Sequence, residues 1–257
     1  MKIKLGRAVA LVCAIAMCAV WASAQMSEGK EKPPMYSYVS FWTIPRAQWA
    51  EMEKADAADE AILQKGLSGG SIIGSGADRN LVHQPDGDTH DEWWSAMSMA
   101  GILNVLDQFY KTGNATTPVL STSTKHWDSI YVTRYYNWHS GSWKDVYTRS
   151  SLYALKESAP DDTLDTLSKN VLVPFFEKLL ADGAIHEYEI DTEAVHTENP
   201  NDFWIVYIAA NAEALDKVDA ALRESLKANP LIGPAFDSMV DFSHHRDYLS
   251  RTTATYK

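Results

Sequence analysis

Two short segments pair a histidine with an aspartate two residues further along the chain. The segments KHWD and HHRD place His126 before Asp128 and His245 before Asp247. In an extended strand, residues two apart point to the same side, so each carboxylate could hold its imidazole in one tautomer. A histidine held in this way could act as a general base, which makes these four the candidate catalytic residues. Because the motif occurs twice and a single active site needs only one, a structural clamp where one copy meets the next is favoured over this role.

The segment VHQPDGDTHDEWW, residues 82–94, is dense in oxygen and nitrogen atoms that could bind a metal ion. Its centre, PDG at 85–87, consists of turn-forming residues, as does NPN at 199–201. An exposed, mobile hairpin tip holds no ligand set in a fixed geometry, so we interpret the segment as a solvated turn and expect no metal site. His83 and His196 are not explained by the turn. They remain candidate metal ligands, with rim histidines that bond to the backbone as the alternative.

An internal repeat indicates which elements position these residues. Residues 65–83, KGLSGGSIIGSGADRNLVH, match residues 178–196, KLLADGAIHEYEIDTEAVH, at a constant offset of 113. Upstream, SYVSFW at 37–42 matches IYVTRY at 130–135 at an offset of 93, which predicts an insertion in the second copy. A repeat of this length indicates one supersecondary unit present twice. The predicted first repeat is 36–127 and the second is 128–257.

Each copy is predicted to contain the same series of elements. A strand is followed by a helix, a hairpin of two strands, a second helix and a short last strand. The expected elements are strands at 36–43 and 130–136, helices at 46–67, from Trp143 and at 211–228, and last strands near 119–124 and 238–242. Gly70 and Gly183 should end the first helices. The order β-α-β-β-α-β is that of the ferredoxin-like motif.

The strand FWIVYIAA at 203–210 is apolar on both faces, although a ferredoxin-like sheet carries helices on one face only. Both of its faces must therefore be buried, and two such sheets packed face to face would bury them. The chain resembles the dimeric α+β barrel superfamily, in the form with both halves in one polypeptide, over residues 36–250. The predicted fold class is α+β, with tandem ferredoxin-like repeats whose antiparallel sheets pack face to face as a barrel.

The first strand of each predicted copy offers an aromatic, a hydroxyl and an aromatic side chain along one face. If this face lines the barrel, Tyr38, Trp42, Tyr131 and Tyr135 form an apolar cavity with polar groups, which is typical of small-molecule sites. The alternative is that the rings fill the core. Arg134 interrupts the pattern, and a guanidinium in a central strand requires a carboxylate or an anionic ligand. These five are the predicted ligand-binding residues.

The favoured hypothesis is a barrel that binds a small-molecule ligand, with catalysis left open and no cofactor expected. The alternative is an oxidoreductase, since the resemblance implies that some two-repeat relatives hold haem through a histidine. The candidate haem ligands here are His126, His196 and His245. A structural or partner-binding module is a third hypothesis, and a homo-oligomer stays open. The sequence contains no dinucleotide fingerprint, nucleophile elbow or HExxH motif.

The first 24 residues have the pattern of a secretory signal peptide. A basic start precedes the apolar stretch 8–20 and the small residues Ala22-Ser23-Ala24. The apolar stretch is shorter than the ~20 residues that an uncleaved spanning anchor requires. Residues 25–35 are predicted to be a flexible leader, and both cysteines lie within the signal. The full chain has a net charge of −11, and removal of three basic residues with the signal gives −14. We therefore expect a periplasmic or secreted protein that binds neither nucleic acid nor membrane.

Overall fold

Eight strands close into a barrel in the computed structural model of the protein, which describes residues 32–197 and 199–257. The strands are β1 (Met35–Trp42), β2 (Gly74–Asn80), β3 (His90–Ala96), β4 (His126–Trp138), β5 (Gly141–Leu155), β6 (Ile185–Glu193), β7 (Asp202–Ala209) and β8 (Val240–Tyr256). Their order around the barrel is β1-β3-β2-β8-β5-β7-β6-β4, and all neighbours are antiparallel. The predicted signal peptide and most of the predicted leader lie outside the described residues.

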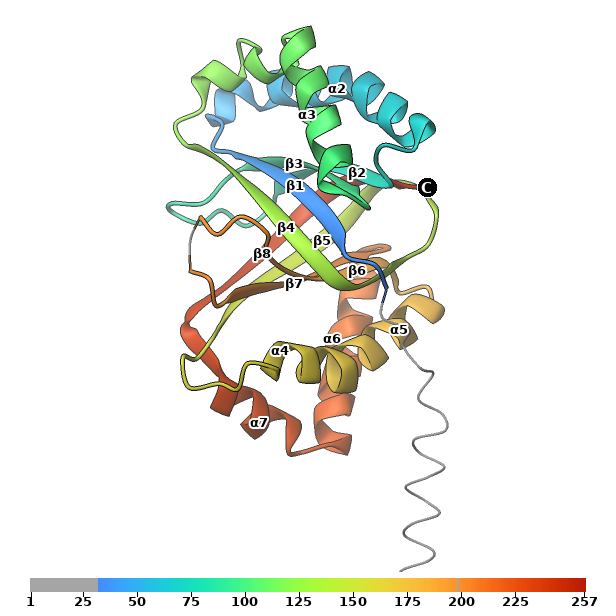
Figure 1. The fold of residues 1–257 in the computed structure, drawn as a ribbon, viewed down its shortest axis with the longest axis vertical. Helices are drawn as coiled ribbons and strands as arrows, with labels where there is room; N and C mark the ends of the chain where they lie inside the picture. Colours follow the sequence, from blue (N-terminus) through green and yellow to red (C-terminus); the bar gives the residue numbers. More distant parts are fainter. Residues whose placement is uncertain (1–31, 198) are drawn as a thin grey trace, which may run out of the picture. The chain divides into compact units, whose positions relative to one another are not determined.

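The barrel consists of two ferredoxin-like sheets, β4-β1-β3-β2 and β8-β5-β7-β6, joined where β2 pairs with β8 and β4 with β6. The first sheet carries α2 (Trp49–Gly69) and α3 (Met99–Thr112), which form one helical layer in Figure 1. The second carries α4 (Thr163–Leu167), α5 (Val173–Ala181), α6 (Ala212–Ala228) and α7 (Ile232–Met239) on the opposite side of the barrel. The predicted tandem ferredoxin-like barrel is therefore confirmed.

The helix ends follow from local sequence signals. Ser98 begins α3, since its hydroxyl accepts a hydrogen bond from the Gly101 amide at 3.2 Å. Asn211 begins α6 in the same way, with its side-chain oxygen 2.9 Å from the Ala214 amide. Gly70 ends α2 at φ 73°, a left-handed conformation that glycine adopts without a steric penalty. The predicted glycine stop at Gly70 is confirmed, and α6 lies where the sequence predicts the helix at 211–228.

The predicted helix from Trp143 and the predicted short strand at 119–124 are both wrong. Residues 141–155 form β5, because Val146, Thr148 and the alternate positions that follow suit a pleated strand. Asp145, which falls within the predicted helix, lies at φ 59° in a bulge of β5. Residues 120–122 form a single 3-10 turn, and the last strand of the first unit is β4.

These corrections change the alignment of the two copies. The match at offset 93 compared β1 with β4, which are the first and last strands of one ferredoxin-like sheet. The structural counterpart of β1 is β5, so Val39, which pairs with Trp93, corresponds to Leu152, which pairs with Trp204. The offset between Val39 and Leu152 is again 113, and the predicted insertion is not needed. In the structure the first unit runs through β4 to Trp138 rather than ending at residue 127.

The apolar cores lie between each sheet and its helices, outside the barrel wall. In the first half, Trp94 stacks on Phe109 of α3 at 5.1 Å and on Tyr38 at 4.4 Å. In the second half, Phe176 of α5 stacks on Tyr188 at 5.3 Å within a cluster that includes the outward side chains of β6 and β7. Since these cores face the helices, the space inside the barrel remains for other side chains.

Close packing at the start of α3 leads to a stability prediction. A Cβ on Gly101 would collide with the Ser71 carbonyl oxygen and lie 2.8 Å from the Ala96 Cβ. Gly101→Ala is therefore expected to lower the free energy of unfolding by roughly 1–3 kcal/mol. Gly69→Ala is the matched control, because nothing lies within 4 Å of its added Cβ and alanine favours a helix. Urea unfolding measures both variants, and equal stabilities would contradict the packing.

Candidate functional site in the barrel lumen

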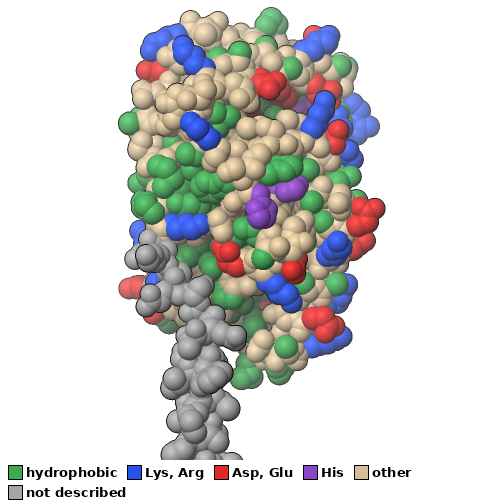
Figure 2. All heavy atoms as spheres, turned by 90° about the vertical axis from the view of Figure 1, so that its right-hand side faces the viewer, with side chains coloured by type: hydrophobic (Ala, Val, Ile, Leu, Met, Phe, Trp, Pro, Cys, Tyr) green, Lys and Arg blue, Asp and Glu red, His purple; other side chains and the backbone are tan. Residues whose placement is uncertain are grey.

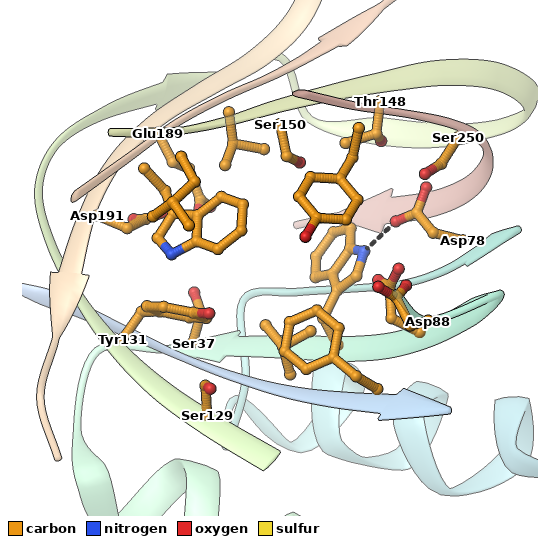
Figure 3. Close-up of a pocket in the computed structure, with 18 of the residues that line it drawn as sticks. Ser37, Asp78, Asp88, Ser129, Tyr131, Thr148, Ser150, Glu189, Asp191 and Ser250 are labelled. Atoms are coloured by element: carbon orange, nitrogen blue, oxygen red, sulfur yellow. Dashed lines mark hydrogen bonds between the residues drawn. The ribbon is translucent and has the colours of Figure 1, made fainter. Parts of the chain in front are cut away.

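Every second side chain of each strand points into the barrel, and these side chains line a cavity of about 170 Å³. Figure 3 shows Asp78, Thr148 and Ser250 on one side of this lumen and Glu189, Asp191 and Tyr131 on the other. Most of the lining belongs to three groups of side chains: aromatic rings (Phe41, Trp93, Trp127, Tyr131, Trp204, Tyr248, Tyr256), hydroxyls (Ser37, Ser95, Ser129, Thr148, Ser150, Ser250) and carboxyls (Asp78, Asp88, Asp91, Glu187, Glu189, Asp191, Glu193, Asp202). The remaining lining residues are Val39, Asn80, Leu152, Val206 and Ile208.

Burial along the strands distinguishes a closed end of the lumen from an open one. At the closed end, Ile208, Tyr256 and Val146 are buried together in an apolar cluster. At the other end the aromatic side chains are only half-buried. There Phe41 stacks on Trp127 at 5.0 Å, and Trp204 lies 5.7 Å from Tyr248. The lumen therefore has an apolar floor and an aromatic mouth.

The ionisable Asp, Glu, Lys, Arg and His side chains described in the lumen lining are all acidic. Among the described residues that line it there are eight carboxyl groups and no lysine, arginine or histidine. The outer surface is different, since Figure 2 shows acidic and basic side chains interspersed over the face that it displays. Asp78 and Asp91 are direct cross-strand partners on β2 and β3, an arrangement that destabilises a sheet when both are charged. The sequence therefore keeps like charges together at a place where folding alone disfavours them.

Asp78 is the best-bonded of these carboxyls. It accepts hydrogen bonds from the Trp93 indole N–H at 3.0 Å, the dashed contact in Figure 3, and from the Thr252 hydroxyl. Thr252 also contacts the Thr148 hydroxyl at 2.6 Å. Burial nevertheless raises the pKa of Asp78 to about 6, because the hydrogen bonds offset only part of the desolvation of its charged form.

The strand β6 supplies three buried carboxyls, at positions 187, 189 and 191. Burial raises the pKa of Asp191 to about 7, although the Thr133 hydroxyl donates a hydrogen bond to it. Burial and the neighbouring carboxyls raise the pKa of Glu187 and Glu189 well above the ordinary value. The Tyr256 hydroxyl donates to Glu189 at 3.3 Å. The Glu187 Oε1 atom has no hydrogen-bond partner among the described residues, and Glu187 is 2% exposed.

The interpretation of 82–94 as a solvated turn is wrong for its second half. The tip around Asp86 is exposed, but Asp88 is 4% exposed and accepts a hydrogen bond from the Asn80 amide at 2.5 Å. From His90 onward the segment is β3, whose alternation sends Asp91 into the lumen and Glu92 toward α2. Several polar residues of β3 are buried, and in the sequence this polar composition resembles that of a loop.

The structure separates the predicted ligand-binding residues. Tyr131 lines the lumen, whereas Tyr38 and Trp42 point outward to the helices. The inward residues of β1 are instead Ser37, Val39 and Phe41, and a shift of one residue exchanges the two faces of a strand. The expectation that the face with Tyr38 and Trp42 lines the barrel is therefore corrected, and the binding role of Tyr131 stays a prediction.

A β-bulge explains the positions of Arg134 and Tyr135. The pairing of β4 with β6 shifts between Thr133 and Tyr135, so one residue is inserted and the alternation reverses. Thr133 faces the lumen side and bonds Asp191, Arg134 is exposed, and the Tyr135 hydroxyl donates to Asp165 of α4 outside the barrel. The guanidinium expected inside the barrel reaches solvent instead.

Both predicted His–Asp pairs form. His126 Nε2 lies 3.5 Å from Asp128, and His245 Nε2 lies 3.5 Å from Asp247. In each pair, the histidine Nδ1 is 2.9 Å from a carbonyl oxygen of the neighbouring strand, that of Phe41 for His126. Neither pair lines the lumen. The geometry is that of a clamp between strands, and a catalytic role stays a prediction.

The two candidate metal ligands lie in different connections between strands. His83 Nε2 contacts the Asn80 carbonyl oxygen at 3.1 Å, with its ring at the edge of Trp49, and His196 is exposed in the β6–β7 connection. Within residues 32–197 and 199–257, no group of three or more His, Cys, Asp or Glu side chains has a geometry that could hold a metal ion.

In the same ranges, no helix is long and apolar enough to span a membrane.

The carboxyls of β6 are not among the site residues predicted from the sequence, although their alternating pattern is visible in it. In IHEYEIDTE, acidic residues occupy every second position from Glu187 to Glu193, and Tyr188, Ile190 and Thr192 lie between them. This alternation normally indicates a strand with one face in water. In a closed barrel, the same face lines the lumen. The signal could have been used once the barrel was inferred from the strand at 203–210.

The comparisons with known proteins find likeness of structure only. No protein-family model matches the chain, and no curated protein matches it. A candidate monooxygenase from Lactobacillus acidophilus has a TM-score of 0.61 at 14% identity, with 88% of this chain and 97% of that chain covered. The chain has the dimeric α+β barrel fold.

Two further dimeric α+β barrels have similar structures. A candidate monooxygenase from Fusobacterium nucleatum has a TM-score of 0.59 at 8% identity, covering 87% of this chain and 94% of that one. An anthrone oxidase-like protein has a TM-score of 0.54 at 12% identity, covering 88% of this chain and 93% of that one. At these identities the likeness concerns the barrel, and function depends on the side chains within it.

Proposed function

We propose that this dimeric α+β barrel binds a small organic molecule in its lumen. The observation that carries the proposal is the lumen itself, a cavity of about 170 Å³ between an apolar floor and an aromatic mouth. An apolar cavity of about 150 Å³ is enough to bind benzene. Aromatic walls with a few convergent polar groups are the usual composition of a small-molecule site. A ligand with about one aromatic ring fits this description.

Filling the lumen should remove the site while the fold remains. Val206 lines the lumen, so Val206→Phe is expected to weaken binding of benzylamine or benzyl alcohol at least ~10-fold, since its ring takes the ligand's space. Leu222→Phe, on the exposed side of α6, is the matched control and should bind as the unchanged protein does. The readout is tryptophan fluorescence, because Trp93, Trp127 and Trp204 line the lumen. Absence of saturable binding, or full binding by Val206→Phe, would contradict the proposal.

The haem alternative has little support from the lumen. Among the described lining residues there is no histidine, and His126 and His245 lie on the outer side of the barrel wall. Haem also carries two carboxylate groups, and the described lining offers them no cationic side chain. The residues present do not fit the group. The structure-level likeness to candidate monooxygenases is to the fold, so catalysis is not part of the proposal.

The proposal includes export. It is supported by the signal-peptide pattern of residues 1–24, which precede the described part of the chain. Expression of the full chain in a bacterial host, followed by fractionation and N-terminal sequencing, is expected to give an exported protein that begins at Gln25. Protein that keeps its first residues in the cytoplasmic fraction would contradict it.

A further inference from the structure

We infer that the ligand of the lumen is a compact organic cation, an ammonium group joined to an aromatic ring through a saturated carbon. This inference rests on the proposed function and names the chemical class that the site takes. It is argued from the one-sided charge of the lumen, from an unpaired carboxyl oxygen deep inside it and from the rings that surround it.

The charged side chains of the lumen lining favour a cationic ligand. A buried carboxyl is expensive unless it is hydrogen-bonded or paired with an opposite charge. Asp78, Asp91, Glu187, Glu189 and Asp191 all line the lumen, and the described lining supplies no cationic side chain to any of them. No described lining residue supplies a positive partner, and a cationic ligand would supply one. An anionic ligand is disfavoured by the same field.

Glu187 is a buried carboxyl of the lumen with an oxygen atom that lacks a hydrogen bond. Its side chain is 2% exposed and lines the cavity, yet its Oε1 atom has no hydrogen-bond partner among the described residues. Buried polar atoms in folded proteins are nearly always bonded, so an unpaired one requires an explanation. An ammonium group offers three N–H donors and would satisfy this oxygen and a second carboxyl beside it. Glu189, two residues along the same face of β6, is the nearest in sequence.

Aromatic rings form a wall of the lumen beside these carboxyls. Trp93, Tyr131 and Trp204 line the same cavity as the carboxyls, and Trp127 lies at its mouth. A cation over an aromatic face is stabilised by the ring quadrupole, most strongly by tryptophan and most strongly where water is excluded. The same rings pack against an apolar ligand body. A ring that carries an ammonium group uses both properties.

The protonation state of the lumen carboxyls determines whether a proton is released when such a ligand binds. The titratable groups that face Glu187 are Glu189 and Asp191 from its own strand, Asp78 from β2 and Tyr256 from β8. The lining residues of β5 and β7 nearest to it, Thr148 and Ile208 among them, are uncharged. Burial raises the pKa of these carboxyls, and for Glu187 and Glu189 the neighbouring acids raise it further, so the lumen holds protons near neutral pH. An incoming ammonium favours the charged carboxylate, so binding should release a proton to solvent.

The test compares three probes of nearly equal size, namely benzylamine, benzyl alcohol and benzoate. Isothermal titration calorimetry of the intact protein at pH 7.5 should show benzylamine binding at least ~10-fold more tightly than benzyl alcohol, with no binding of benzoate. Repeating the titration in buffers of different ionisation enthalpy should show proton release with benzylamine alone. Benzyl alcohol that binds as tightly as benzylamine would overturn the inference and leave the proposed function standing. Failure of every probe would overturn both.

Two variants assign the effect to the named carboxyls. Glu187→Gln and Glu189→Gln each keep the shape of the side chain and remove its charge, and each is expected to weaken benzylamine binding at least ~10-fold while benzyl alcohol is unaffected. Glu60→Gln, an exposed position on α2, removes the same charge from the surface and should have no effect. If all three variants bind benzylamine equally, the inference is wrong. Circular dichroism confirms that each variant is folded.

Discussion

Raising the pH from 5 to 8 is expected to lower the thermal midpoint of unfolding by roughly 10 °C, on the scale of a few degrees per kcal/mol for a chain of this size. The cause is the set of buried carboxyls. Burial raises the pKa of Asp78 to about 6 and of Asp191 to about 7, and within α2 burial and nearby acids raise the pKa of Asp56 to about 7. An unfolded aspartate has a pKa of about 3.9.

The sign of the effect follows from proton binding. Between pH 4 and pH 7 the folded protein holds protons that the unfolded chain has lost, so stability falls as the pH rises. The stabilisation is fully present below about pH 4 and is lost as the pH passes through the folded pKa values of about 6 to 7. His90 acts in the opposite direction, because burial lowers its pKa to about 4, but it is one group against several.

Differential scanning calorimetry at constant ionic strength measures this dependence. The fall in midpoint should persist at high salt, because buried groups are screened far less than surface charges. Asp191→Asn should flatten the curve between pH 5 and pH 8, since the amide has no proton to lose. A midpoint that is constant or rises over this interval would show that the lumen carboxyls are not buried as described.

Glu187→Gln is expected to stabilise the protein at pH 8 and to have little effect on its stability at pH 4.5. Burial and the neighbouring acids raise the pKa of Glu187 well above its ordinary value, so the unchanged side chain must take up a proton or bear a buried charge on folding. The amide avoids both. The difference in unfolding free energy should grow by up to about 1.4 kcal/mol per pH unit above the unfolded pKa.

Urea unfolding at several pH values tests this prediction, with Glu60→Gln as the control that should show no such trend. Because the same substitution is expected to weaken benzylamine binding, Glu187 would lower the stability of the fold while serving its site. Residues that destabilise a protein in this way are common at functional sites. A Glu187→Gln variant whose stability differs by the same amount at every pH would contradict the account.

The fold could be predicted from the sequence because its strongest signals are local or repeated. The caps at Gly70 and Asn211, the match between 65–83 and 178–196, and the doubly apolar strand at 203–210 each indicated an element correctly. The first strand of the second copy was misplaced. Both β4 and β5 are rich in aromatic and β-branched residues, and periodicity does not show which strand pairs with which.

The site was harder to predict, because the direction of a side chain in a strand depends on register. Tyr38 and Ser37 differ by one position and lie on opposite sides of the barrel wall. A single bulge at Arg134 reverses the alternation of β4, and a bulge leaves no clear mark in the sequence. The acidic alternation of β6 was visible, but only closure of the barrel identifies that face as a lumen.

The most direct measurement is a crystal structure of the protein soaked in benzylamine. The account predicts the ligand inside the barrel, with its ammonium group within hydrogen-bond distance of the Glu187 or Glu189 carboxylate and its ring against the aromatic wall. A lumen closed by its own side chains, or benzylamine bound only on the outer surface, would contradict it.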